Sequence, residues 1–153
     1  MTKILFVCHG NICRSPMAEF LMKEMVRQEK LEQDIYIESA AATTEEIGND
    51  IYPPAKRKLT EKGIPFQPRQ ARLMTKRDYE HFDYIIGMDQ ENLWDMRHIC
   101  GGDREKKISL LMQWAGSTRD VADPWYTRNF ETTYLDLVEG CTALLNSIKE
   151  RIL

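Results

Sequence analysis

Val7-Cys8-His9-Gly10-Asn11-Ile12-Cys13-Arg14-Ser15-Pro16 is the stretch that decides both the fold and the chemistry of this chain. It completes a short apolar run, residues 2–8, of the kind that forms a buried β-strand. A helix follows at once, with Ser15 as its expected N-cap and Pro16 as its first residue. A cysteine therefore lies at the end of a strand, and an arginine follows after five intervening residues. We expect this loop to hold a phosphate above the cysteine sulfur.

The residue types of this loop suit the binding of an anion. Successive backbone N–H groups can converge on phosphate oxygens, and a helix N-terminus attracts negative charge. Arg14 can hold two oxygens in a bidentate fork, which lysine cannot do. Gly10 gives the loop conformational freedom, and Asn11 tolerates left-handed geometry and can tie the loop together. The expected phosphate-binding loop, or P-loop, consists of His9, Gly10, Asn11, Ile12 and Cys13.

Cys8 is the candidate nucleophile. Helix N-termini and neighbouring arginines stabilise a cysteine thiolate, and both features follow Cys8 directly. Ser15 is placed to hydrogen-bond the sulfur and help it leave in a second step, in addition to capping the helix. A cysteine and an arginine at this spacing also occur by chance. Their position between a strand and a helix favours the catalytic interpretation over a buried structural cysteine.

Composition and charge exclude several function classes. The chain has 153 residues, 42% of them hydrophobic and 29% charged, which predicts one soluble domain over residues 1–153. A net charge of −3 gives no electrostatic basis for binding nucleic acid. The five apolar residues after Lys3 are too few for a signal peptide or a membrane span, and no later run is long enough. We therefore expect a cytoplasmic protein that does not insert into membranes.

The four cysteines predict neither a disulfide framework nor a metal site. Cys100 and Cys141 fall at apolar helical positions, which favours core packing. Cys8 and Cys13 are four residues apart, and no second pair of ligands with zinc-finger spacing follows them. We expect no cofactor and no metal ion.

Apolar runs alternate with helical patterns along the whole chain. This alternation predicts βαβ units and a parallel, doubly wound α/β sheet, in which ligands bind beyond the carboxyl ends of the strands. Cys8 lies at such an end. Strands are expected at 2–8, 34–40, 82–88 and 107–111, helices at 15–31, 54–62, 90–100 and 134–148, and loops at 43–54, 67–75 and 115–129. Asp89 is the expected N-cap of the helix at 90–100.

The residues Val7 to Glu19, VCHGNICRSPMAE, strongly resemble the signature of the low-molecular-weight protein tyrosine phosphatases. The resemblance spans nearly the full chain. It implies a single α/β domain of the phosphotyrosine protein phosphatase I type, with a four-stranded parallel sheet and helices on both faces. The implied activity is hydrolysis of phosphotyrosine and aryl phosphates through a phosphocysteine intermediate. The implied partners are phosphotyrosine-containing proteins, and the implied state is a monomer or a weak dimer.

The resemblance also supplies a proton donor. Asp123-Pro124-Trp125-Tyr126 matches the aspartate-proline motif that the family places on a late loop. The proline restricts the backbone of Asp123, and a nearby phosphate dianion favours the protonated carboxyl. The acid can protonate the leaving oxygen and, once ionised, activate water. Trp125 is expected to form a wall of a deep slot for a phenyl ring, and Tyr126 is a second candidate for that wall.

The chain departs from the family pattern around this slot. His9 stands where the family often has an apolar residue, and we expect it at the rim. Glu45 and Glu46 occupy a loop that usually brings an aromatic to the slot, so the second wall is expected to be missing or acidic. We hypothesise that these carboxylates favour substrates with basic residues near the phosphotyrosine.

One further position concerns the support of the loop, because Ser39 matches the family serine that braces Asn11. Arg69 stands where family members often carry a histidine before an Ala-Arg pair, and we expect this departure to alter the rim of the slot. In the family, a cysteine at the position of Cys13 can form a reversible disulfide with the nucleophile, here Cys8, and so protect it from irreversible oxidation. The alternative is that Cys13 is only a small apolar residue of the loop.

Other functions fit the residues less well. An arsenate reductase needs further cysteines to relay a disulfide outward, and none lies between Cys13 and Cys100. A protein-arginine phosphatase typically carries threonine where this chain has Ile12. A phosphocysteine carrier would not require Arg14 or Asp123, and a catalytically silent phosphate-binding module is expected to have lost one of them or the nucleophile.

Overall fold

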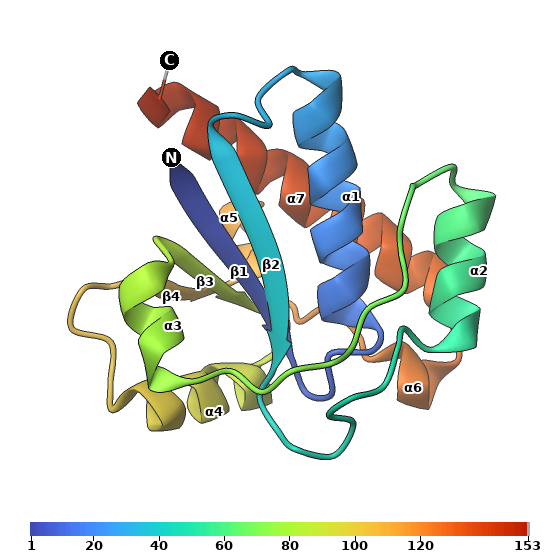
Figure 1. Ribbon diagram of the computed structural model, residues 1–153, viewed down its shortest axis with the longest axis horizontal. Helices are drawn as coiled ribbons and strands as arrows, with labels where there is room; N and C mark the ends of the chain where they lie inside the picture. Colours follow the sequence, from blue (N-terminus) through green and yellow to red (C-terminus); the bar gives the residue numbers. More distant parts are fainter. Residues whose placement is uncertain (153) are drawn as a thin grey trace.

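Four parallel strands form one sheet in the order β2-β1-β3-β4, which confirms the predicted α/β fold (Figure 1). The structure is a computed structural model and describes residues 1–152. The strands are β1 (Thr2–Cys8), β2 (Ile35–Ala41), β3 (Tyr84–Gly87) and β4 (Ile108–Leu110). The helices are α1 (Arg14–Gln28), α2 (Pro53–Glu61), α3 (Lys76–His81), α4 (Gln90–Cys100), α5 (Leu111–Trp114), α6 (Pro124–Thr127) and α7 (Phe130–Ile152).

The central strand β1 is buried on both faces, as expected for a parallel sheet covered by helices. Because successive side chains of a strand alternate, Ile4 and Phe6 point to the face covered by α1 and α7. Leu5 and Val7 point to the opposite face, where they pack in the core cluster that includes side chains of α4. All four side chains are fully buried. This packing holds the end of β1, and with it Cys8, in a fixed position.

The segments that follow the strands gather at one end of the sheet. Figure 1 shows the β1–α1 loop, the long β2–α2 loop and α6 at this end. The irregular segment before α3 also reaches it, because Ala41 donates its N–H to the Arg72 carbonyl at 2.7 Å and accepts from Met74 at 2.8 Å. Residues far apart in the chain therefore meet beyond the carboxyl ends of the strands.

The start of α1 differs from the prediction. The helix begins at Arg14 with Cys13 as its N-cap residue, and no side chain caps it. The expectation that Ser15 is the N-cap is therefore wrong, because its hydroxyl is engaged with Cys8 and Asn11 instead. The helix also ends at Gln28, several residues earlier than predicted.

Three short helices were not predicted. α6 lies within the expected loop 115–129, and α5 follows β4 without a break. α3 carries a capping box formed by Thr75 and Asp78, a pattern that the sequence does contain. The long helix α7 extends beyond the predicted range at both ends. Of residues 1–152, no helix is both long and apolar enough to cross a membrane.

Candidate active site

Cys8 lies at the end of β1, almost fully buried, with its sulfur facing the first turn of α1. The Ser15 hydroxyl is 3.0 Å from Cys8 Sγ, and the Ser15 backbone N–H also donates to the sulfur at 3.4 Å. The sulfur therefore has two hydrogen-bonding groups at a helix N-terminus, an arrangement that stabilises a thiolate.

Arg14 is buried beside the loop and is held by three oxygens. Its Nη1 donates to Asp89 Oδ2 at 2.7 Å and to the Val121 carbonyl at 2.9 Å, and its Nη2 donates to Asp123 Oδ2 at 3.4 Å. Burial alone lowers the pKa of Arg14, but the negative charges of Cys8 and Asp89 outweigh this effect and raise it. The guanidinium is therefore a permanent cation in a fixed orientation.

Asp123 approaches Arg14 from α6. Its Oδ1 accepts the Trp125 backbone N–H at 3.0 Å and so caps this short helix, while its Oδ2 faces the guanidinium. The ring of Trp125 packs against Tyr52, with 4.9 Å between the ring centroids. Tyr126 is mostly exposed beside it. The structure thus places a carboxyl and two aromatic side chains on one side of the loop.

Asn11 lies fully buried beneath the loop and adopts a left-handed backbone conformation, with φ of 60°. Its Nδ2 donates to Ser15 Oγ at 2.8 Å and to Ser39 Oγ at 2.9 Å. Its Oδ1 accepts from the Arg69 guanidinium and from the Arg72 backbone N–H. The hydrogen bond expected between Asn11 and Ser39 is therefore present. Arg69, which was expected at the rim of the slot, instead binds Asn11 beneath the loop and lies outside the pocket lining.

Gly10 serves a different purpose from the one expected. Its φ lies outside the left-handed region, which Asn11 occupies instead. A Cβ atom at Gly10 would lie 3.2 Å from Glu46 Cγ, so the glycine allows the β2–α2 loop to approach closely. Close packing, rather than an unusual backbone conformation, accounts for the glycine at this position.

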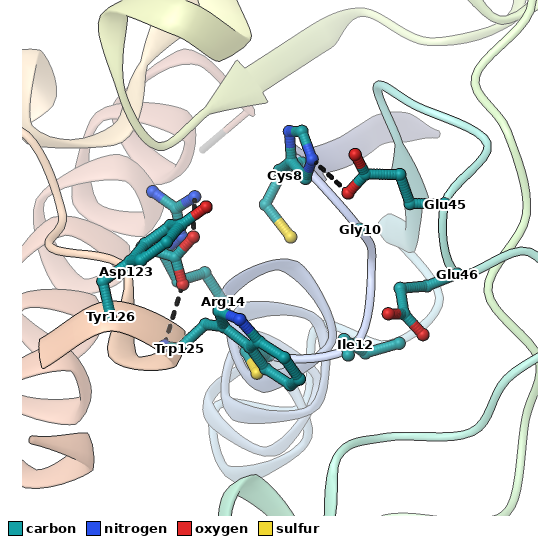
Figure 2. Close-up of a pocket in the computed structure, with 11 residues that line it drawn as sticks. Cys8, Gly10, Ile12, Arg14, Glu45, Glu46, Asp123, Trp125 and Tyr126 are labelled. Carbon is teal, nitrogen blue, oxygen red and sulfur yellow. Dashed lines mark hydrogen bonds and ion pairs between the residues drawn. The ribbon is translucent and has the colours of Figure 1, made fainter. Parts of the chain in front are cut away.

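The pocket above Cys8 has one aromatic and one acidic wall. Figure 2 shows Trp125 and Tyr126 on one side and Glu45 and Glu46 on the other. Cys8 and its loop, including His9, Gly10, Ile12 and Cys13, form the remaining lining together with Arg14 and Asp123. The second wall is therefore acidic, one of the two alternatives that the sequence left open.

His9 connects the loop to this acidic wall. Its Nε2 lies 2.6 Å from Glu45 Oε2, and its Nδ1 lies 3.6 Å from Glu91 Oε1. Both carboxylates are mostly exposed, so the contacts lie at the mouth of the pocket. Glu91 was not predicted to belong to the site, because no local pattern distinguishes it from other exposed glutamates in the first turn of a helix.

Two other residues were missed. Tyr52 packs on Trp125 from the start of α2, and Asp89 holds Arg14 from the start of α4. Asp89 does cap α4, as predicted, by accepting the Asn92 backbone N–H at 2.8 Å. The sequence therefore marked Asp89 as a helix cap, and only the tertiary structure shows its second partner.

All four cysteines are free thiols in this structure and are buried. Burial raises the pKa of Cys13 well above its ordinary value, and the negative charge of Cys8 raises it further. Cys13 therefore stays protonated beside the candidate nucleophile. Among residues 1–152, no group of three histidine, cysteine, aspartate or glutamate side chains is placed to hold a metal ion.

Comparisons with known proteins agree with this geometry. Residues 3–152 match the family described as low molecular weight phosphotyrosine protein phosphatase. The chain is 38% identical over 152 residues to the low molecular weight protein-tyrosine-phosphatase YfkJ of Bacillus subtilis, covering 98% of this chain and 97% of that protein. It is 41% identical over 150 residues to the Gallus gallus low molecular weight phosphotyrosine protein phosphatase, covering 93% and 92% of the two chains.

Solved structures show the same similarity in three dimensions. The crystal structure of Bacillus subtilis YfkJ superposes with a TM-score of 0.96 at 38% identity, covering 100% of this chain and 98% of that one. The structure of a Drosophila arginine phosphatase superposes with a TM-score of 0.88 at 31% identity, covering 97% and 98%. Together with the family match, these relationships show that the chain belongs to the low-molecular-weight protein tyrosine phosphatase family and is a phosphoric monoester hydrolase.

Proposed function

We propose that this chain hydrolyses phosphotyrosine in two steps, with Cys8 as nucleophile. In the first step, the Cys8 thiolate attacks phosphorus while the bond between phosphorus and the phenolic oxygen breaks. Asp123 donates its proton to that oxygen, and a phosphocysteine forms. In the second step, Asp123 takes a proton from water, which attacks phosphorus and displaces the Cys8 thiolate. Inorganic phosphate and the original enzyme result.

The position of Arg14 supports this proposal most directly. Its guanidinium is buried next to the loop that surrounds Cys8, and it also contacts Asp123. A phosphate between the sulfur and the guanidinium would therefore lie beside the acid that has to protonate the leaving group. Arg14 would stabilise the equatorial oxygens of the transition state, the role that fixed cations play in phosphoryl transfer.

Turnover of an aryl phosphate by three variants tests these roles. We expect Cys8→Ser to abolish hydrolysis and Asp123→Asn to lower kcat by about 10²- to 10⁴-fold, the usual contribution of general acid–base catalysis. Asp120→Asn is the matched control, because Asp120 is exposed and lies outside the pocket. Hydrolysis that survives Cys8→Ser would exclude Cys8 as the nucleophile.

Phosphoarginine is the alternative substrate that the test has to include. One structural relative is a Drosophila arginine phosphatase, whereas Ile12 favours tyrosine at the position that typically carries threonine in such enzymes. We expect phosphotyrosine peptides to be hydrolysed faster than phosphoarginine. Faster hydrolysis of phosphoarginine would identify phosphoarginine as the substrate class and would leave the role of Cys8 unchanged.

We propose that the acidic wall selects the residues that flank phosphotyrosine. Glu45 and Glu46 line the pocket, and Glu91 lies nearby beyond His9. Opposite charges across an interface favour association, so a peptide with lysine or arginine next to phosphotyrosine should react faster than one with acidic neighbours. Glu45→Gln and Glu46→Gln should reduce this difference. Equal rates on both peptides, or a preference for acidic neighbours, would refute the proposal.

We propose a protective disulfide between Cys8 and Cys13. Peroxide would convert the Cys8 thiolate to a sulfenic acid. The Cys13 thiol would then attack the sulfur of this sulfenic acid, which breaks the S–O bond, releases water and forms the disulfide. Both cysteines line the same pocket, and the protonated state of Cys13 leaves Cys8 as the first to be oxidised. Mass spectrometry after mild peroxide should find the Cys8–Cys13 linkage. A sulfonic acid at Cys8 without a linkage would contradict it.

Five expectations stay predictions from the sequence. They are a cytoplasmic location, a monomeric or weakly dimeric state, phosphoprotein partners, the lack of nucleic-acid binding and a single domain over residues 1–153.

A further inference from the structure

Trp94 is a large apolar side chain that points away from the core. It lies on α4 and is 69% exposed, whereas the buried side of this helix consists of Asn92, Met96 and Cys100. Tryptophan side chains are on average highly buried. A single exposed apolar residue is nevertheless common, so exposure alone does not indicate a partner. The orientation of the indole and its place beside the pocket provide the further evidence.

His98 holds the indole in one orientation. The centroids of the two rings are 5.4 Å apart and their planes differ by 2°, the geometry of an offset stack between residues about one helical turn apart. Because the imidazole covers one side of the indole and most of the residue is exposed, the opposite ring face is open to solvent. An aromatic face that is fixed before binding loses little side-chain freedom when a ligand packs on it.

Trp94 lies on the same face of α4 as Glu91, which reaches the mouth of the pocket. α4 begins directly after Asp89, which binds Arg14, and Figure 1 shows the helix at the same end of the sheet as the β1–α1 loop. Glu91 Oε1 lies 3.6 Å from Nδ1 of His9, a residue of the pocket lining. Residues three apart on a helix are neighbours, so Trp94 follows Glu91 about 4.5 Å further along the helix axis.

This position is within reach of a peptide whose phosphotyrosine occupies the pocket. An extended peptide advances about 3.3 Å per residue, so a side chain about two to four positions from the phosphotyrosine can lie over Trp94. The residues directly beside the phosphotyrosine are closer to Glu45 and Glu46, which line the pocket itself. A small aryl phosphate ends before it reaches α4.

The charges around the indole indicate which ligand it suits. Glu91 lies on the pocket side of Trp94, and its carboxylate is mostly exposed. Arg97 and His98 follow on the far side, about one turn later. A cation is therefore attracted to the pocket side of the indole. A guanidinium fits this side best, because it can stack flat on an indole face while its N–H groups donate to a carboxylate.

We propose that Glu91 and Trp94 bind an arginine of the substrate peptide, about two to four residues from the phosphotyrosine. The proposal rests on the proposed hydrolysis of phosphotyrosine and extends substrate recognition from the pocket to the surface of α4. Neither residue belongs to the pocket lining, so both affect the choice of peptide and not the chemical step.

Pairs of phosphotyrosine peptides test this site. One peptide of each pair carries arginine and the other carries citrulline, its uncharged isostere, at the same position on either side of the phosphotyrosine. At one or more positions about two to four residues away, we expect kcat/KM of the wild type to be about three- to tenfold higher with arginine, the factor of one exposed cation–π contact and one exposed ion pair. Trp94→Ala should lower this ratio about two- to fivefold, and Trp94→Phe should keep part of it.

Two controls separate binding of the peptide from other effects. Leu135→Ala truncates another exposed apolar side chain, on α7 and outside the pocket lining, and should leave the ratio unchanged. Trp94→Ala should leave kcat/KM for a small aryl phosphate within about twofold of the wild type, because this substrate does not reach the indole.

Three results would overturn the proposal while phosphotyrosine hydrolysis stays intact. They are equal rates within every pair of peptides, an arginine advantage that Trp94→Ala leaves unchanged, and sedimentation data in which Trp94→Ala dissociates a dimer at the assay concentration. The last result would make a second copy of the chain the partner of this face. Failure of the proposed function would show differently, as no turnover of any phosphotyrosine peptide, and the proposed arginine site would fall with it.

Discussion

Asp89 uses its two carboxylate oxygens for two tasks, and two substitutions can separate them. Its Oδ2 binds Arg14 Nη1 at 2.7 Å, and its Oδ1 caps α4 by accepting the Asn92 N–H at 2.8 Å. Asp89→Asn keeps one carbonyl oxygen for the cap and turns an NH₂ group towards the guanidinium. Asp89→Ala removes both interactions. The difference between the variants therefore measures the cap, and the loss in Asp89→Asn measures the ion pair.

The expected magnitudes follow from burial. Removing one partner of a buried ion pair costs about 3–5 kcal/mol when the other charge is left unpaired. The Arg14 side chain is 2% exposed and that of Asp89 22%, but Val121 and Asp123 still hold the guanidinium. We therefore expect a smaller loss, about 2 kcal/mol, for Asp89→Asn. Asp89→Ala should lose about 1 kcal/mol more, the typical contribution of an N-cap.

Urea unfolding and steady-state kinetics check both values. Asp95→Asn is the matched control, because it removes the same charge from α4 at a position without a described partner and should leave stability nearly unchanged. Because Arg14 loses its main orienting partner, kcat/KM of both Asp89 variants should fall by about 10- to 100-fold. Equal stability of the two variants would show that the cap contributes nothing. Wild-type stability and activity in Asp89→Asn would refute the argument for the ion pair.

Two further predictions concern the packing of α7. A Cβ atom at Gly140 would lie 2.4 Å from Leu111 Cγ. Gly140→Ala should therefore lower the urea midpoint, because about 1–3 kcal/mol of overpacking exceeds the helix gain of about 1 kcal/mol, and a raised midpoint would contradict this. Burial raises the pKa of Cys141, so its contribution to stability is complete below about pH 8.5 and is lost above it, by about 1.4 kcal/mol per pH unit, as the unfolded thiol ionises. Between pH 8.5 and 10.5 the stability of Cys141→Ala should fall less steeply than that of the wild type, and parallel curves would argue against it.

The floor of the site was predictable because its parts are neighbours in the chain. A buried strand, a short loop and a helix start determine where Cys8 and Arg14 lie relative to each other, and the local pattern indicates all three elements. The left-handed conformation of Asn11 is a local property too. The error at Ser15 arose because local capping rules take no account of a competing partner, here the Cys8 sulfur.

The supports and the rim were harder to predict because they depend on long-range contacts. Arg14 meets Asp89 across 75 positions of the sequence, and Asn11 meets Arg69 across 58. No periodicity or capping pattern encodes such pairs. One part of the acidic wall was predicted, because the sequence shows that the β2–α2 loop is acidic. The contact between His9 and Glu91 was not predicted.

Asp89 and Asp123 show why local and catalytic geometry are linked in this site. In each of them Oδ1 accepts a backbone N–H at a helix start, from Asn92 at 2.8 Å or from Trp125 at 3.0 Å, while Oδ2 faces Arg14. A carboxylate tied to a backbone N–H loses its rotational freedom when the protein folds and not when the substrate binds. The two helix starts therefore orient the guanidinium in advance, which is what electrostatic stabilisation of a transition state requires. A substitution that weakens either cap should accordingly lower kcat even where the charge facing Arg14 is kept.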